Sequence, residues 1–132
     1  MSMAEIVLYT HSGWRYLVLL VSAIALIKFI YGWIAKTEWS KFDQWLLAGY
    51  AGVITIQWFL GLLLWIIYGF PTAPYFLEHL VTMTIAIVPA HIGLARAGRA
   101  ETSLQKYKTA TIFVGISTLL VWLGVARVTG VM

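Results

Sequence analysis

Residues 12–35 read SGWRYLVLLVSAIALIKFIYGWIA, and this stretch decides the fold class. It is almost entirely apolar over a length that exceeds the roughly 20 residues a helix needs to cross a bilayer. Inside a membrane the backbone must satisfy its own hydrogen bonds, so a helix is expected here and not a strand. Similar apolar runs follow at residues 45–68, 76–95 and 110–128. The sequence therefore predicts four membrane-spanning helices.

The composition of the chain is typical of integral membrane proteins. Of its 132 residues, 61% are hydrophobic and 11% are charged, and the mean hydropathy is +0.87. A soluble domain carries about 25% charged residues. The connections between the apolar runs are short, which makes consecutive helices antiparallel neighbours. We expect an all-α, integral membrane, four-helix up-down-up-down bundle that forms a single domain over residues 1–132.

The sequence excludes several classes of function. It contains no cysteine, which rules out disulfides, iron–sulfur clusters and zinc–thiolate sites. It has no Gly-rich phosphate loop, no paired carboxylates and no Ser/His/Asp set. The only aspartate, Asp43, is expected in a loop. The net charge of +4 does not indicate nucleic-acid binding, because the basic residues lie mostly in two short loops.

The distribution of lysine and arginine predicts how the chain is oriented, because positive residues concentrate on the cytoplasmic side of membrane proteins. Only two of them, Arg15 and Arg127, are expected on one side. The other side is expected to carry Lys28, Lys36, Lys41, Arg96, Arg99, Lys106 and Lys108. The first and third loops are therefore predicted to be cytoplasmic and both termini outside. The Lys28 side chain is expected to extend toward the inner headgroups.

The chain has three histidines, and two of them point to a cofactor. His11 is expected just before the first helix and His79 at the start of the third, so both lie at the outer face. A six-coordinate haem needs two imidazoles at similar depth from two different elements, and this pair meets that requirement. His91 follows His79 by about 18 Å along one helix, so it cannot share the iron and a second haem is not expected. The alternative for the pair is a hydrogen bond to a carbonyl or a lipid headgroup.

Arg15 follows His11 by one helical turn and lies on nearly the same face. A charged residue inside a spanning segment indicates a functional site. A guanidinium can bind a haem propionate through two hydrogen bonds, and we expect this role for Arg15. The alternatives are extension to the outer headgroups or an ion pair with Glu78. Arg127, at the outer end of the fourth apolar run, is a second candidate for binding a propionate.

Gln57 and Gly61 lie on one face of the second apolar run. Glutamine at mid-membrane depth needs an internal partner, so Gln57 is expected to face the interior of the bundle. Gly61, one turn later, allows either a flat ring or another helix to approach closely. Two roles remain open for these residues: a hydrogen bond between helices with small-residue packing, and cofactor binding.

The likeness of this chain to a known family extends over nearly its whole length. The stretches that carry it are LYTHSGWRYLVLL, QWFLGLLLW, EHLVTMTIAIVPAHIGLARAGRA and KYKTATIFVGISTLL, in this order. They resemble small bacterial four-helix membrane proteins described as cytochrome b-like. The most recognisable residues are His11, Ser12, Gly13 and Arg15 at the start, Gln57 and Gly61 in the second run, and Glu78 and His79 at the head of the third.

This resemblance implies that His11 and His79 are haem ligands. Better-known di-haem b-type cytochromes carry four ligand histidines, whereas this chain has three. Three histidines cannot fill two bis-histidine sites, so this difference argues against a pair of haems that transfers electrons across the membrane. The resemblance also implies a multi-pass protein of the bacterial inner membrane.

These observations favour a membrane b-type cytochrome with one haem b bound between His11 and His79 near the outer face. It would transfer single electrons with quinol or with a redox partner, as a carrier or complex subunit rather than a stand-alone enzyme. One alternative is a cofactor-free accessory subunit of a larger respiratory or photosynthetic membrane complex. Another is a quinone- or lipid-binding module that uses Gln57 and Trp58. A bundle of this size buries few side chains, so a homo-oligomer or a larger redox complex is an expected assembly.

Overall fold

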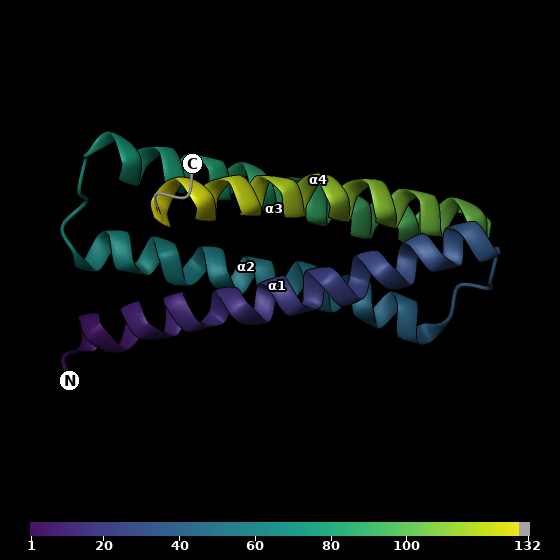
Figure 1. The fold of residues 1–132 in the computed structure, drawn as a ribbon, viewed down its shortest axis with the longest axis horizontal. Helices are drawn as coiled ribbons and strands as arrows, with labels where there is room; N and C mark the ends of the chain where they lie inside the picture. Colours follow the sequence, from purple (N-terminus) through teal and green to yellow (C-terminus); the bar gives the residue numbers. More distant parts are fainter. Residues whose placement is uncertain (130–132) are drawn as a thin grey trace.

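The structure, a computed structural model, describes the backbone of residues 1–129 and the side chains of residues 1–127. Four long helices lie side by side (Figure 1): α1 (Met3–Ala35), α2 (Lys41–Ile67), α3 (Pro74–Arg99) and α4 (Ser103–Thr129). Each of them is long and apolar enough to cross a membrane. The prediction of an all-helical chain with four long apolar helices is therefore confirmed.

The connections between the helices lie at two opposite ends of the molecule (Figure 1). Residues 36–40 and 100–102 lie at one end, which we call the 36–40 end. Residues 68–73 lie at the other, the 68–73 end, together with the start of α1 and the end of α4. The two helices α1 and α4 diverge from each other toward the 68–73 end (Figure 1).

A capping residue sets the start of α1. This helix begins at Met3, well ahead of the start near residue 12 expected from hydropathy. The side chain of Ser2 accepts a hydrogen bond from the backbone N–H of Glu5, which satisfies one of the free donors of the first turn. His11 consequently lies inside α1, and the expectation that it precedes the helix is wrong.

The next two helices begin with equally specific local signals. Ser40 and Asp43 form a reciprocal capping box at the start of α2, so Asp43 lies in the first helical turn and not in a loop, as was expected. In the connection that follows, Gly69 adopts a φ of 78°, which suits a residue without a Cβ. Pro74 is the first residue of α3. A backbone N–H at this position would have no partner within the helix, so a proline, which lacks this group, costs no hydrogen bond there.

The last two helices extend further than the apolar runs predicted. Helix α3 continues to Arg99 instead of ending near residue 95, and α4 begins at Ser103 instead of near residue 110. Arg96 and Arg99 lie in the last turn of α3, where positive side chains interact favourably with the helix dipole. Hydropathy therefore marks the apolar section of each helix, whereas polar residues continue the helix on either side.

Small residues form a large part of the bundle core, where they let the helix backbones approach closely. Six buried alanines belong to the core: Ala25, Ala51, Ala86, Ala90, Ala97 and Ala110. Gly93 serves the same purpose, because a Cβ added there would stand 2.6 Å from Cβ of Phe113. Many large apolar side chains face outward instead, among them Ile24, Ile27, Ile34, Phe59 and Trp122. Such an apolar exterior is suited to contact with lipid.

A polar network joins α1, α2 and α4 at the 36–40 end. The carboxylate of Asp43 is fully buried, and Nζ of Lys28 lies 2.7 Å from its Oδ1. The hydroxyl of Tyr107 donates to Oδ2 at 2.7 Å. Gly32 makes room for this contact, because a Cβ there would overlap the Tyr107 ring. Lys28 is thus held by an ion pair at the 36–40 end of the bundle, with a partner that the sequence pattern did not predict.

Candidate functional site

A cavity of about 450 Å³ lies within the 68–73 end of the bundle, and all four helices line it. Most of its lining side chains are apolar, including Leu19, Leu64, Leu80, Met83, Ile87 and Val121. Its few polar side chains are His11, Ser12, Arg15, Gln57 and His79, with the indoles of Trp58 and Trp65 and the phenol of Tyr68. An apolar cavity of this size with a small number of convergent polar groups is the usual form of a ligand site.

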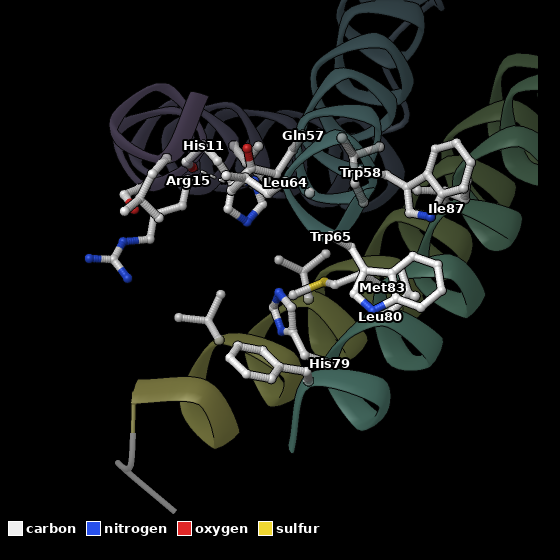
Figure 2. Close-up of a pocket in the computed structure, with 18 of the residues that line it drawn as sticks. His11, Arg15, Gln57, Trp58, Leu64, Trp65, His79, Leu80, Met83 and Ile87 are labelled. Carbon is white, nitrogen blue, oxygen red and sulfur yellow. Dashed lines mark hydrogen bonds between the residues drawn. The ribbon is translucent and has the colours of Figure 1, made fainter. Parts of the chain in front are cut away.

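The imidazoles of His11 and His79 face each other across this cavity (Figure 2). Their ring centroids are 6.4 Å apart and their planes are inclined by 81°. A bond between a metal and an imidazole nitrogen is about 2.0–2.1 Å long, so two imidazoles on opposite sides of one metal have centroids roughly 6 Å apart. A nitrogen of each ring is directed toward the other ring (Figure 2). The spacing of the two rings would therefore allow both to bind one metal ion.

The orientation of His79 is set by α4. Its Nδ1 lies 3.2 Å from the carbonyl oxygen of Gly124. A carbonyl can only accept a hydrogen bond, so Nδ1 carries the proton and Nε2 of the neutral ring keeps its lone pair. A Cβ added at Gly124 would stand 2.5 Å from Cε of Met83, so the flexible Met83 side chain would have to move to admit a larger residue there. Ligand histidines in proteins are commonly held in this way by a carbonyl on the second nitrogen.

His11 is placed by α2. Its ring packs against Gly61, where an added Cβ would stand 3.1 Å from Cε1 of the imidazole. Its backbone carbonyl accepts a hydrogen bond of 2.8 Å from Nε2 of Gln57. The structure thus brings Gln57 and Gly61 to the same histidine, as neighbours of the cavity. Both residues thus contact His11 between α1 and α2, and both line the cavity.

Arg15 also lines the cavity, one turn after His11. Its guanidinium donates a hydrogen bond of 3.2 Å to the Tyr16 hydroxyl. It has no ion pair with Glu78, the alternative considered above, because Glu78 is bound by Arg127 at 2.7 Å across α3 and α4. Arg15 is therefore the positive group available to an anionic ligand in the cavity.

Arg127 is the one predicted site residue that the structure places elsewhere. It does not line the cavity; with Glu78 it borders a shallow groove on the outside of α3 and α4. Its side chain is 53% exposed, and the guanidinium is engaged by the Glu78 carboxylate. The other five predicted residues line one cavity: His11, Arg15, Gln57, Gly61 and His79.

His91 lies apart from the cavity. Its Nε2 is 2.8 Å from the hydroxyl oxygen of Thr55, so it bridges α3 to α2. Among the residues that the structure describes, no group of three or more His, Asp or Glu side chains could hold a metal ion. Two imidazoles alone are nevertheless enough for a haem, because the macrocycle supplies the remaining nitrogen ligands.

Two features of the site were not anticipated from the sequence. The first is the carbonyl of Gly124, which cannot be recognised as a partner of His79 before the helices are packed. The second is the wall formed by α2 and α3, in which Trp65 and Met83 line the cavity and Trp58 donates to the Thr84 hydroxyl at 2.9 Å. Among these residues the sequence marks only Trp58, as a candidate for quinone or lipid binding. Trp65, Met83 and Gly124 appear in it as ordinary residues of apolar helices.

Comparisons of the chain with models of protein families, with curated proteins and with solved structures find no match.

Proposed function

We propose that this protein is a membrane b-type cytochrome that binds one haem b between His11 and His79. It would transfer single electrons with quinol in the bilayer or with another redox protein. The observation that carries the proposal is the pair of facing imidazoles, 6.4 Å apart, in an apolar cavity. The resemblance to cytochrome b-like bacterial proteins points to the same two residues.

Each residue of the cavity has a role in this proposal. His11 and His79 would hold the iron, and the positive charge of Arg15 would bind a propionate. Gly61 leaves the space in which the His11 ring lies. The apolar walls would keep water from the ring and so contribute to its potential. The haem itself supplies the one-electron chemistry.

We also propose that the four helices span a bacterial cell membrane as an up-down-up-down bundle. Their length and apolar composition support this placement. The surplus of lysine and arginine near residues 36–40 and 100–102 favours a cytoplasmic position for the 36–40 end. The haem site at the 68–73 end would then lie near the outer face, where both termini are expected.

The test is visible spectroscopy of the full chain, purified in detergent after expression with an ample supply of haem. We expect a sharp α-band of a b-type cytochrome in the reduced-minus-oxidised spectrum and one haem per chain. Substituting either ligand, as His11→Ala or His79→Ala, should abolish the six-coordinate signature. The matched control is His91→Ala, which removes the histidine bound to Thr55 and should keep the full band.

Two results would overturn the proposal: a colourless wild-type protein, or a full α-band in the His79→Ala variant. A colourless chain that copurifies with large membrane partners would favour the accessory-subunit alternative. A colourless chain that retains a prenylated quinone or lipid would favour the binding-module alternative. The wall of Trp58, Trp65 and Met83 supports this last candidate, because it offers flat and flexible apolar surfaces to such a molecule.

A further inference from the structure

The side chain of Gln57 makes a hydrogen bond to His11, one of the two proposed haem ligands. Its Nε2 donates to the backbone carbonyl of His11 at 2.8 Å. In Figure 2 the Gln57 side chain lies beside the His11 residue, between α2 and α1. The amide is therefore held at the residue that carries the imidazole.

Two buried polar atoms at this contact lack a partner. They are Nδ1 of His11 and Oε1 of Gln57, and no other buried side-chain nitrogen or oxygen within the described residues is left unpaired in this way. Buried polar groups without a partner are unfavourable, and they are uncommon for that reason. The two atoms are complementary, because Nδ1 of a neutral imidazole can carry a proton and an amide oxygen accepts one.

We propose that Gln57 is a positioning residue, whose amide oxygen accepts a hydrogen bond from Nδ1–H of His11 and so fixes the tautomer of this ring. The ring then presents Nε2, with its free lone pair, to the cavity. A glutamine suits the task because one amide can donate to the carbonyl and accept from the ring of a single residue. Gln57 acts through His11 in this proposal and does not touch the haem.

The arrangement at His79 supports this assignment. There the carbonyl of Gly124 on α4 holds Nδ1 of the imidazole. Gln57 on α2 would do the same for His11 on α1, so each ring is held by a helix other than its own. Both rings would then offer an unprotonated Nε2 to the cavity, and a free lone pair is what each ligand of an iron needs. The consequence for haem binding rests on the proposed function, whereas the tautomer of His11 does not.

The first experiment uses the full chain without haem, labelled with nitrogen isotope at histidine and studied by NMR in detergent. The shifts of the imidazole nitrogens distinguish the two neutral tautomers. We expect His11 in the wild-type protein to be protonated at Nδ1, and to become a mixture of tautomers in Gln57→Leu. The control is Tyr50→Phe. Tyr50 lies on α2 two turns before Gln57, and the substitution removes its hydrogen bond to Thr118 on α4; it should leave the tautomer of His11 unchanged.

The second experiment titrates haem into the same variants and records the midpoint potential. Loss of a partner that orients a ligand lowers affinity by about 10- to 100-fold, so this loss is expected for Gln57→Leu and not for Tyr50→Phe. The potential of Gln57→Leu should move in the positive direction, because an imidazole without an acceptor on Nδ1 is a weaker donor to iron. A purely structural role would not shift the potential of protein that does bind haem.

The proposal is overturned if wild-type His11 carries its proton on Nε2, a result that needs no variant. It is also overturned if Gln57→Leu folds and leaves both the tautomer and the potential unchanged. If the chain binds no haem but the tautomer depends on Gln57, the proposed function fails and the positioning role stands. If Gln57→Leu binds haem with full affinity and an unchanged potential, and the tautomer of His11 is also unchanged, the proposed function stands and the positioning role fails.

Discussion

Nζ of Lys28 on α1 lies 2.7 Å from Oδ1 of Asp43, a carboxylate that is completely buried at the start of α2. The second oxygen of the same carboxylate accepts hydrogen bonds from the Tyr107 hydroxyl and from the backbone N–H of Ser40. One side chain thus joins three helices. The Lys28 side chain is 32% exposed, so water can partly solvate its ammonium group. The Asp43 side chain is completely buried, so its carboxylate depends more strongly on the ion pair.

Removing the lysine should destabilise the bundle markedly. In Lys28→Met the buried Asp43 carboxylate loses its counter-charge, which costs about 3 kcal/mol or more of unfolding free energy for a buried pair. The measurement is thermal or denaturant unfolding in detergent, followed by circular dichroism. The matched control is Lys41→Met at an exposed position on α2, where a change within about 0.5 kcal/mol is expected. Equal effects of the two substitutions would contradict the role of the ion pair.

Adding one methyl group at Gly61 should disturb the haem site without unfolding the protein. In Gly61→Ala the new Cβ would stand 3.1 Å from Cε1 of His11, so the ring must shift away from α2. We expect haem affinity to fall by about tenfold, in line with other changes that displace a ligand. Gly52→Ala is the control, because no atom lies within 4 Å of a Cβ at that position. It should keep the affinity and raise the helix propensity by about 1 kcal/mol.

The two outer arginines should differ in their effect on haem binding. Arg15 lines the cavity, and in the proposed site it would bind a propionate. Arg15→Gln would then lose a charged hydrogen bond worth about 1.5–3 kcal/mol and should weaken haem binding by about tenfold or more. Arg127→Gln breaks only an exposed ion pair with Glu78, worth about 1 kcal/mol or less. Haem titration of the purified variants measures both. Equal losses of affinity would place a propionate at both arginines and contradict the assignment.

The proposed orientation can be tested because the natural chain has no cysteine. Thr72 and Glu101 are exposed and lie in connections at opposite ends of the bundle. In intact cells, Thr72→Cys should react with a thiol reagent that cannot cross membranes, whereas Glu101→Cys should react only after the cells are permeabilised. Labelling of the two variants on gels reads out the result. The reverse pattern would place the haem site on the cytoplasmic side.

The fold could be predicted largely from the apolar runs, because a helix is the only structure that satisfies the backbone over such a length in lipid. The helix ends were predicted less well. The start of α1 depends on one hydrogen bond at Ser2, outside the apolar run. Asp43 illustrates the same limit. Its spacing from Ser40 is that of a capping box, but its ion pair with Lys28 depends on how α1 and α2 pack.

The site could be predicted in part, because residues at one depth on different helices are expected to meet. This reasoning paired His11 with His79 and put Gln57 and Gly61 on one face. It could not decide which arginine pairs with Glu78. That choice depends on α3 and α4 being neighbours, which brings Arg127 to the carboxylate. Nor could it find the Gly124 carbonyl, since every residue carries such a group.

The network of Lys28, Asp43 and Tyr107 clamps only one end of the molecule. Local opening of the bundle should therefore begin at the opposite end, where α1 and α4 diverge (Figure 1). Amide hydrogen exchange would then grow faster along α1 from Phe29 toward its first turns. If the bundle opens in this way, a bulky planar molecule would be able to enter between the helices while the network at the 36–40 end keeps them in register.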